Sequence, residues 1–159
     1  MFESYSLEEI PFDLNGNNTS TPMTALFKYC SNLISIPKMN KIMPSSTAYI
    51  FYKCSNLKEI PDDIDIDWDW SYYLNNSAGR GYMFADCYSL RKYPNNFLNH
   101  GYSSTGYSSS IYNNLFNSCY VLDEVIDLPM PPYTSAWSSS AFSYTIQGCQ
   151  RLKNFTFAL

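Results

Sequence analysis

The sequence predicts an α/β repeat solenoid of about six coils, in which residues 1–159 form a single domain. Three observations support this prediction. One motif returns along the chain, its copies follow one another at intervals of about 30 residues, and each copy joins an apolar stretch to a short strand-like segment. A unit of this length cannot bury its apolar side alone, so neighbouring copies are expected to stack and share one core.

The motif is centred on the five cysteines and reads F-x-x-C-x-x-L-x-x-I-P in its fullest form. Its copies occupy residues 27–37, 51–61, 84–94, 116–125 and 146–155. The last two copies lack the proline, and the fifth has Ile146 in place of phenylalanine. A further partial copy without a cysteine ends at residues 7–11. Successive cysteines lie 24, 33, 32 and 30 residues apart, which is the repeat length of a solenoid.

Each coil is expected to contain a helical turn or irregular segment, a corner near the cysteine and a short parallel strand. Residues 47–53 have apolar side chains spaced for one or two helical turns. In residues 57–60, Leu57 and Ile60 bracket two polar residues, and Pro61 ends the strand because proline cannot donate a ladder hydrogen bond. The strands would line the concave face, and the helical turns or irregular segments would line the convex face.

The five cysteines occupy one position in each copy, so we expect a buried ladder of free thiols along the core. They are Cys30, Cys54, Cys87, Cys119 and Cys149. A free cysteine behaves as a compact hydrophobic residue, and the odd number argues against a disulfide framework. The chain has no C-x-x-C pair and a single histidine, His100. We therefore expect no metal site and no cofactor.

Composition excludes several classes of function. Ten Lys and Arg stand against fourteen Asp and Glu, a balance that would repel nucleic acid. No apolar run approaches the roughly 20 residues that span a bilayer, so no membrane insertion is expected. The first residues lack the basic and apolar regions of a secretory signal peptide. No nucleophile with a base, phosphate loop or carboxylate pair stands at a suitable spacing, so we expect no enzyme.

Three insertions lengthen the later coils, near residues 62–80, 95–110 and 129–140. Loops on a rigid scaffold often carry recognition, and tyrosine or tryptophan rings can stack on sugars or anchor a protein interface. The candidate ligand-binding residues in these insertions are Trp68, Trp70, Tyr72, Tyr73, Tyr102, Tyr107, Tyr133 and Trp137. The serines around the later ones are typical of adaptable binding surfaces. Solvated low-complexity loops stay an equal alternative for the second and third insertions.

The first insertion also has a structural interpretation. Residues 63–70 alternate Asp with Ile or Trp, which on an extended strand places the acids on one face. An edge strand whose aspartates block further pairing is therefore an alternative to a binding role. A calcium loop is disfavoured, because Trp68 stands where such a loop requires glycine.

A second candidate surface is the strand face. One outward residue precedes the second apolar position of each strand, giving the row Glu9, Ser35, Glu59, Lys92, Glu124 and Asn154. Such a row lines the concave side of a solenoid, where ligands commonly bind. The row is weakly acidic and is interrupted by Lys92, so we expect no strong electrostatic steering.

The run of Phe-x-x-Cys-Ser-Asn-Leu-x-x-Ile-Pro resembles the BspA-like leucine-rich repeats of bacterial surface proteins, which also occur in parasitic protists, large viruses and bacteriophage. The resemblance covers six copies, and the four central ones carry the specific residues. It implies a right-handed leucine-rich-repeat solenoid used for adhesion and recognition outside the cell or on a virion. It implies no chemistry.

The predicted function is a non-enzymatic recognition or adhesion module that binds a host-surface protein or glycan. The absent signal peptide favours a virion component, such as a phage tail or fibre protein, over a cell-surface protein. The terminal copies lack polar caps, so neighbouring subunits are also expected to bind at the open solenoid ends. The alternative is a purely structural protein whose ends join the subunits of a larger assembly.

Overall fold

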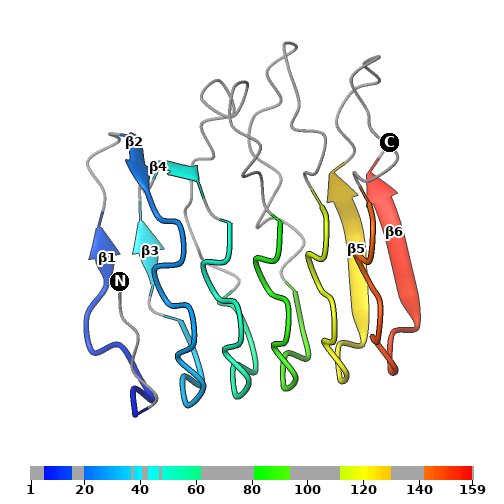
Figure 1. Cartoon of the computed structure of the whole chain (residues 1–159), viewed down its shortest axis with the longest axis horizontal. Coiled ribbons are helices and arrows are strands. Elements are labelled where there is room, and N and C mark those ends of the chain that lie inside the picture. The colour runs from blue at the N-terminus through cyan, green and yellow to red at the C-terminus, as the bar shows by residue number, and fades with distance from the viewer. Residues whose placement is uncertain are drawn as a thin grey trace.

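The computed structural model describes residues 6–15, 20–36, 38–40, 43–46, 48–61, 81–93, 112–129 and 142–158. In these ranges the chain makes a row of similar passages that stand side by side, from β1 at one end to β6 at the other (Figure 1). We name each passage that contains a cysteine by that residue, from the Cys30 unit to the Cys149 unit. Each unit runs from a turn segment through its cysteine to an extended segment.

The strands are short and pair in parallel. They are β1 (Leu14–Asn15), β2 (Ser20–Pro22), β3 (Met39–Asn40), β4 (Met43–Ser46), β5 (Glu124–Pro129) and β6 (Asn154–Ala158). The pairs are β1 with β3, β2 with β4, and β5 with β6. Parallel pairing requires a long connection between partners, and here that connection is the remainder of one unit.

Isolated parallel bridges extend this pairing between the middle units. They join Ser35 to Glu59, Glu59 to Lys92 and Lys92 to Glu124, and Glu124 then faces Asn154 in the β5–β6 pair. Five of the six residues predicted for the strand face therefore lie in one continuous row. We call the surface that carries this row the bridge side.

The segment before each cysteine is a chain of turns, and the described residues contain no helix. The sequence predicts a helical turn or an irregular segment over residues 47–53. In the described part, residues 48–53, the segment is irregular and contains no helical turn. The cause is visible in the backbone, because Tyr49 and Lys53 have φ angles of 60° and 62°. Such left-handed residues interrupt a right-handed helix.

Hydrogen bonding in the turn segments alternates between neighbouring units and the unit itself. In the Cys54 unit, Tyr52 N–H and Cys54 N–H bond to carbonyls of their own unit. Three other N–H groups of the segment cross to the next unit: Tyr49 bonds to the Gly81 carbonyl, Phe51 to that of Met83 and Lys53 to that of Ala85, at 3.3, 3.1 and 3.0 Å. The same three crossing bonds recur at each described junction from the Cys30 unit to the Cys149 unit. Stacking thus satisfies backbone donors that a helix would pair internally.

Left-handed residues recur at two positions, five residues and one residue before each cysteine. They are Ala25, Tyr29, Tyr49, Lys53, Tyr82, Asp86, Asn114, Ser118, Tyr144 and Gly148. Nine of these ten are not glycine, although a left-handed conformation costs a residue with a Cβ about 1–2 kcal/mol. The crossing hydrogen bonds compensate for this strain, because the left-handed residues of the inner units donate them.

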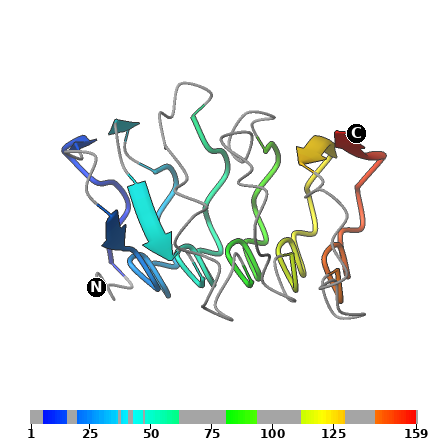
Figure 2. The same cartoon turned by 90° about the horizontal axis from the view of Figure 1, so that it is seen from above.

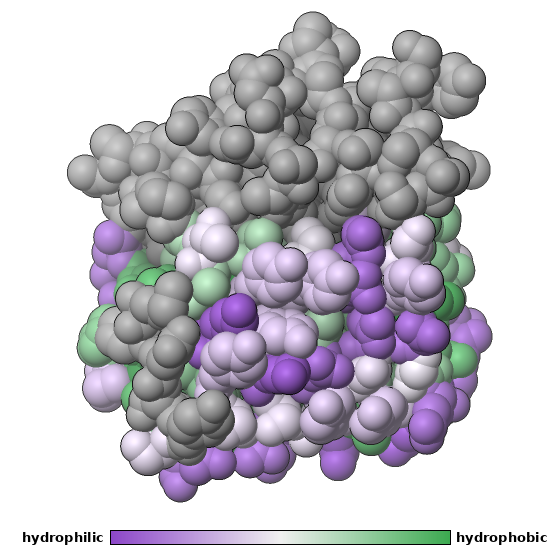
Figure 3. Space-filling model, viewed as in Figure 1, coloured by the Kyte–Doolittle hydropathy of each residue, from purple (hydrophilic) through white to green (hydrophobic). Residues whose placement is uncertain are grey.

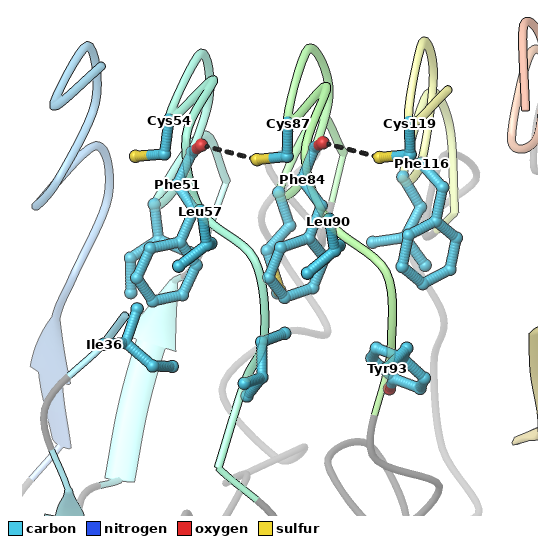
Figure 4. Close-up of a cluster of buried hydrophobic side chains, with 14 of the residues drawn as sticks. Ile36, Phe51, Cys54, Leu57, Phe84, Cys87, Leu90, Tyr93, Phe116 and Cys119 are labelled. Atoms are coloured by element: carbon cyan, nitrogen blue, oxygen red, sulfur yellow. Dashed lines mark hydrogen bonds between the residues drawn. The ribbon is translucent and has the colours of Figure 1, made fainter. Parts of the chain in front are cut away.

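The core is a set of ladders that run across the units. Phe27, Phe51, Phe84 and Phe116 stack in sequence with ring centroids 5.5 to 5.7 Å apart and planes within 8° of parallel. Leu33, Leu57, Leu90 and Leu122 form a second, fully buried row beside them. Figure 4 shows the phenylalanine, leucine and cysteine positions repeating from unit to unit.

The cysteines form a third ladder. Cys30, Cys54, Cys87 and Cys119 are fully buried, Cys149 is half-buried, and all five are free thiols. Each of the last four thiols donates to the carbonyl oxygen of the phenylalanine in the preceding unit, at 3.1 to 3.2 Å (Figure 4). A buried S–H group with a carbonyl partner stabilises the stack and offers no exposed nucleophile.

Candidate recognition site

The turn segments zigzag along one side of the molecule, which we call the turn side (Figure 2). Tyrosines gather on this side because unit stacking places repeated positions next to one another. Tyr49 and Tyr82, each five residues before a cysteine, stack with ring centroids 5.0 Å apart and planes 13° from parallel. Tyr52 contacts both rings, and Tyr29 lies 5.8 Å from Tyr52. In the view of Figure 3, the described surface is mostly hydrophilic, with apolar residues in separate small areas.

Two lysines lie over this tyrosine cluster. Lys28 Nζ is 4.9 Å from the Tyr29 ring centroid and 5.2 Å from that of Tyr49. Lys53 Nζ is 5.3 Å from the Tyr52 centroid. The interaction with Tyr52, and to a smaller extent with other neighbours, raises the pKa of Lys53. These contacts are cation–π interactions, so the rings and the ammonium groups hold each other in place.

A hollow of about 280 Å³ opens beside this cluster. It is lined by the residues directly before and after three successive cysteines: Tyr29 and Ser31, Lys53 and Ser55, Asp86 and Tyr88. Stacking converts these two sequence positions into a compact site made by three units. Ser55 Oγ donates to the Ser31 carbonyl at 3.2 Å, which fixes one hydroxyl of the hollow.

The Tyr88 ring forms one wall of this turn-side hollow. It stacks on Tyr120 at 5.0 Å with planes 8° from parallel, and both residues are about 40% exposed. Partial burial, followed by the nearby Asp86 carboxylate, raises the pKa of Tyr88, so its hydroxyl stays protonated at neutral pH. The hollow therefore combines tyrosine rings, serine hydroxyls, one ammonium group and one carboxylate.

A second hollow, of about 310 Å³, lies on the bridge side. Ser35, Glu59 and Lys92 of the predicted strand-face row line it, together with the preceding residues Ile34, Lys58 and Arg91. The predicted row alone is weakly acidic, whereas the hollow contains three cations and one carboxylate. The row formed by Ile34, Lys58 and Arg91 was not predicted, although each of these residues lies four positions after a cysteine in the aligned copies. Of the remaining predicted residues, Glu9, Glu124 and Asn154 are exposed.

The eight predicted aromatic binding residues lie outside the described residues. They are Trp68, Trp70, Tyr72, Tyr73, Tyr102, Tyr107, Tyr133 and Trp137. Most of the three insertions that contain them is likewise outside, so their binding role stays a prediction. The tyrosines that the structure does describe belong to the repeats themselves, for which the sequence predicts no binding role.

The cysteine thiols are poorly suited to nucleophilic chemistry. Burial raises the pKa of Cys87 and Cys119 well above the ordinary value, and raises that of Cys149 to about 11. Thiolate is the reactive form, so these groups are inert near neutral pH. Among the described residues, no group of three or more His, Cys, Asp or Glu side chains is arranged to hold a metal ion.

No protein-family model, curated protein or solved structure matches this chain. The likeness to BspA-like repeats therefore rests on the motif alone. In the described part of the chain, no helix has the length and apolar character needed to cross a membrane.

Proposed function

We propose that the chain is a leucine-rich-repeat solenoid that acts as a non-enzymatic recognition module and binds a host-surface glycan through the turn-side hollow. Its expected place is a virion or an extracellular surface. The observation that supports a carbohydrate ligand is the chemistry of the turn-side hollow, where Tyr88 presents a partly exposed ring beside serine hydroxyls, Lys53 and Asp86.

Sugars combine apolar C–H faces with many hydroxyl groups. The C–H faces pack on aromatic rings, and the hydroxyls exchange hydrogen bonds with polar side chains. Charged side chains form stronger hydrogen bonds than neutral hydroxyls do. A hollow of about 280 Å³ suits a small ligand or one sugar of a chain. A stable protein partner would instead need a wide interface with a largely uncharged core.

The scaffold favours binding by a preorganised site. Three of the lining residues, Tyr29, Lys53 and Asp86, each donate a crossing backbone hydrogen bond to the next unit, at 2.9, 3.0 and 2.8 Å. Because the turn segments are held on both sides, little conformational entropy would be lost when a ligand binds.

A glycan array tests this proposal with the fluorescently labelled chain. We expect selective binding to a set of glycans, and loss of that binding in Tyr88→Ala and in Lys53→Ala. The matched control is Tyr144→Ala, which removes a 61% exposed tyrosine from outside the turn-side hollow. Binding by Tyr88→Ala and Lys53→Ala at the level of the unmodified chain would contradict the proposal, as would an array without any bound glycan.

A second candidate function is assembly through the end of the row, and one surface supports it. At the Cys149 unit, an apolar hollow of about 310 Å³ is lined by Phe142, Thr145, Ile146, Phe155 and Phe157. Within the described residues, the N–H groups of Tyr144, Ile146 and Gly148 have no acceptor, although their equivalents in earlier units all cross to the next unit. A further unit of the same repeat would cover the apolar hollow and supply acceptors for these N–H groups.

The occupant that fits this end is a second copy of this chain, because a unit of the same repeat offers carbonyls at the positions that accept the crossing bonds of earlier units, such as Ile50 and Tyr52. Sedimentation velocity tests it: association that Ile146→Lys abolishes would support assembly, and a monomer at 200 µM would contradict it.

A further inference from the structure

Two of the three cations in the bridge-side hollow occupy the same repeat position in neighbouring units. Lys58 and Arg91 each lie four residues after their cysteine, and Arg91 N–H donates to the Lys58 carbonyl at 2.9 Å. Side chains at facing positions of paired extended segments are neighbours, and like charges there repel each other. This pair therefore creates a local positive potential in a chain whose net charge is −4.

The adjacent units do not neutralise this pair. In the same row, the residue after Arg91 along the stack is Asp123, whose Oδ1 is 3.2 Å from Arg151 Nη2 and 3.8 Å from Lys153 Nζ. Asp123 thus already has two cationic partners. Within the described residues, neither Lys58 nor Arg91 forms an ion pair.

The remaining lining of the bridge-side hollow is suited to a sugar ring. Ile34 is 37% exposed and gives an apolar surface for C–H groups. Ser35 offers a hydroxyl, and the Glu59 carboxylate accepts hydrogen bonds from ligand hydroxyls. The Glu59 charge also disfavours a second anionic group close to the first.

We propose that the bridge-side hollow binds a sugar acid, with its single carboxylate held between Lys58 and Arg91. The Arg91 guanidinium can bind a carboxylate through two parallel hydrogen bonds, and the Lys58 ammonium adds a point charge. The sugar ring would then lie towards Ile34, with hydroxyls near Ser35 and Glu59. This inference deepens the proposed glycan recognition by naming an acidic sugar, at a hollow that shares no lining residue with the turn-side one.

The row itself limits the ligand to a short anionic group. Beyond Lys92, the next residue of the bridge row is Glu124, which is exposed. A polymer with closely spaced phosphates or sulfates would meet this carboxylate one unit further along the stack. An isolated carboxylate on an otherwise neutral sugar avoids that repulsion.

Saturation-transfer difference NMR tests the proposal with sodium glucuronate as the probe and glucose as its neutral counterpart. We expect saturable glucuronate binding that weakens as sodium chloride rises from 50 to 500 mM, because salt screens exposed charges. Lys58→Gln and Arg91→Gln should each weaken binding by about five-fold, the upper range for an exposed ion pair. Lys153→Gln removes a cation at the same repeat position that already has a partner, and should leave binding unchanged.

Several results would overturn the inference. Equal binding of glucose would remove the role of the carboxylate, and equal binding of acetate would remove the role of the sugar. Tighter binding of a glutamate dipeptide would assign the hollow to an acidic peptide. Loss of glucuronate binding in Tyr88→Ala would place the acid at the turn-side hollow, which would contradict this inference while leaving the proposed function intact.

Discussion

Replacing Phe84 with alanine tests how strongly the stacked units depend on one another. The Phe84 side chain is fully buried between Phe51 and Phe116, with ring centroids 5.6 and 5.7 Å away, and the Tyr93 ring meets its edge at 6.1 Å. Truncating a buried phenylalanine costs about 3–5 kcal/mol. Since two parallel stacks and one edge contact are lost together, we expect a value near the upper end, about 4–5 kcal/mol.

Ile146 provides the matched comparison, because it occupies the same repeat position in the Cys149 unit. It is 38% exposed, and no described unit covers its outer side. Ile146→Ala should therefore cost about 1 kcal/mol, well below the cost for a buried isoleucine. Phe84→Leu retains most of the buried volume and should cost less than about 1.5 kcal/mol.

Urea unfolding followed by circular dichroism measures these differences as shifts of the midpoint at an unchanged slope. A loss of 4–5 kcal/mol is a large part of the stability of a domain of this size, so Phe84→Ala should be close to unfolding at 37 °C. Equal losses for Phe84→Ala and Ile146→Ala would refute the reasoning. A loss below about 2 kcal/mol for Phe84→Ala would refute it as well.

Three further predictions concern the thiols, the last turn and the surface charges. Because burial raises the pKa of Cys87 and Cys119, the unfolded chain binds fewer protons than the folded chain above about pH 8.5. The free energy of unfolding should therefore fall as pH rises, by up to about 1.4 kcal/mol per pH unit for each thiol, and Cys87→Ala should reduce that slope in urea titrations. Gly148→Ala should lower the free energy of unfolding by about 1 kcal/mol, because Gly148 has a φ of 78° and a Cβ there would lie 3.4 Å from Ser118 Cα. An unchanged midpoint in thermal unfolding would contradict this. Asp123→Asn breaks two exposed ion pairs and should cost less than about 1 kcal/mol, with the difference vanishing in 1 M salt; a loss that persists there would show another role for Asp123.

The repeated apolar positions could be predicted from the sequence because they follow a fixed distance from each cysteine. The phenylalanine three residues before the cysteine and the leucine three residues after it both lie in the core, as in Phe51 and Leu57. Each such position is defined by its copies, so a single alignment of the motif identifies it without any knowledge of the fold.

The turn segment could not be predicted in the same way. Its apolar spacing is compatible with a helical turn, and Tyr49 and Lys53 carry no sign of a left-handed backbone. Tyrosine and lysine rarely adopt that conformation, which here depends on hydrogen bonds to a neighbouring unit. Propensity describes a residue within its own segment and therefore misses an effect that arises between segments.

The two hollows illustrate the same limit. Tyr29, Lys53 and Asp86 are far apart in the sequence and share only their place before a cysteine. They form one site because the units stack in register, and their distance along the chain hides that proximity. Listing the residues column by column across the aligned copies would have placed these three, and also Lys58 and Arg91, side by side.

Amide hydrogen exchange followed by NMR tests the central claim, that crossing hydrogen bonds join equivalent positions of successive units. The N–H groups of Phe84 and Phe116 donate to the next unit at 3.0 and 2.8 Å, whereas that of Ile146 has no described acceptor. At a concentration where the chain is monomeric, we predict slow exchange for Phe84 and Phe116 and fast exchange for Ile146. Exchange of Phe84 and Phe116 as fast as that of Ile146 would contradict the stacked arrangement.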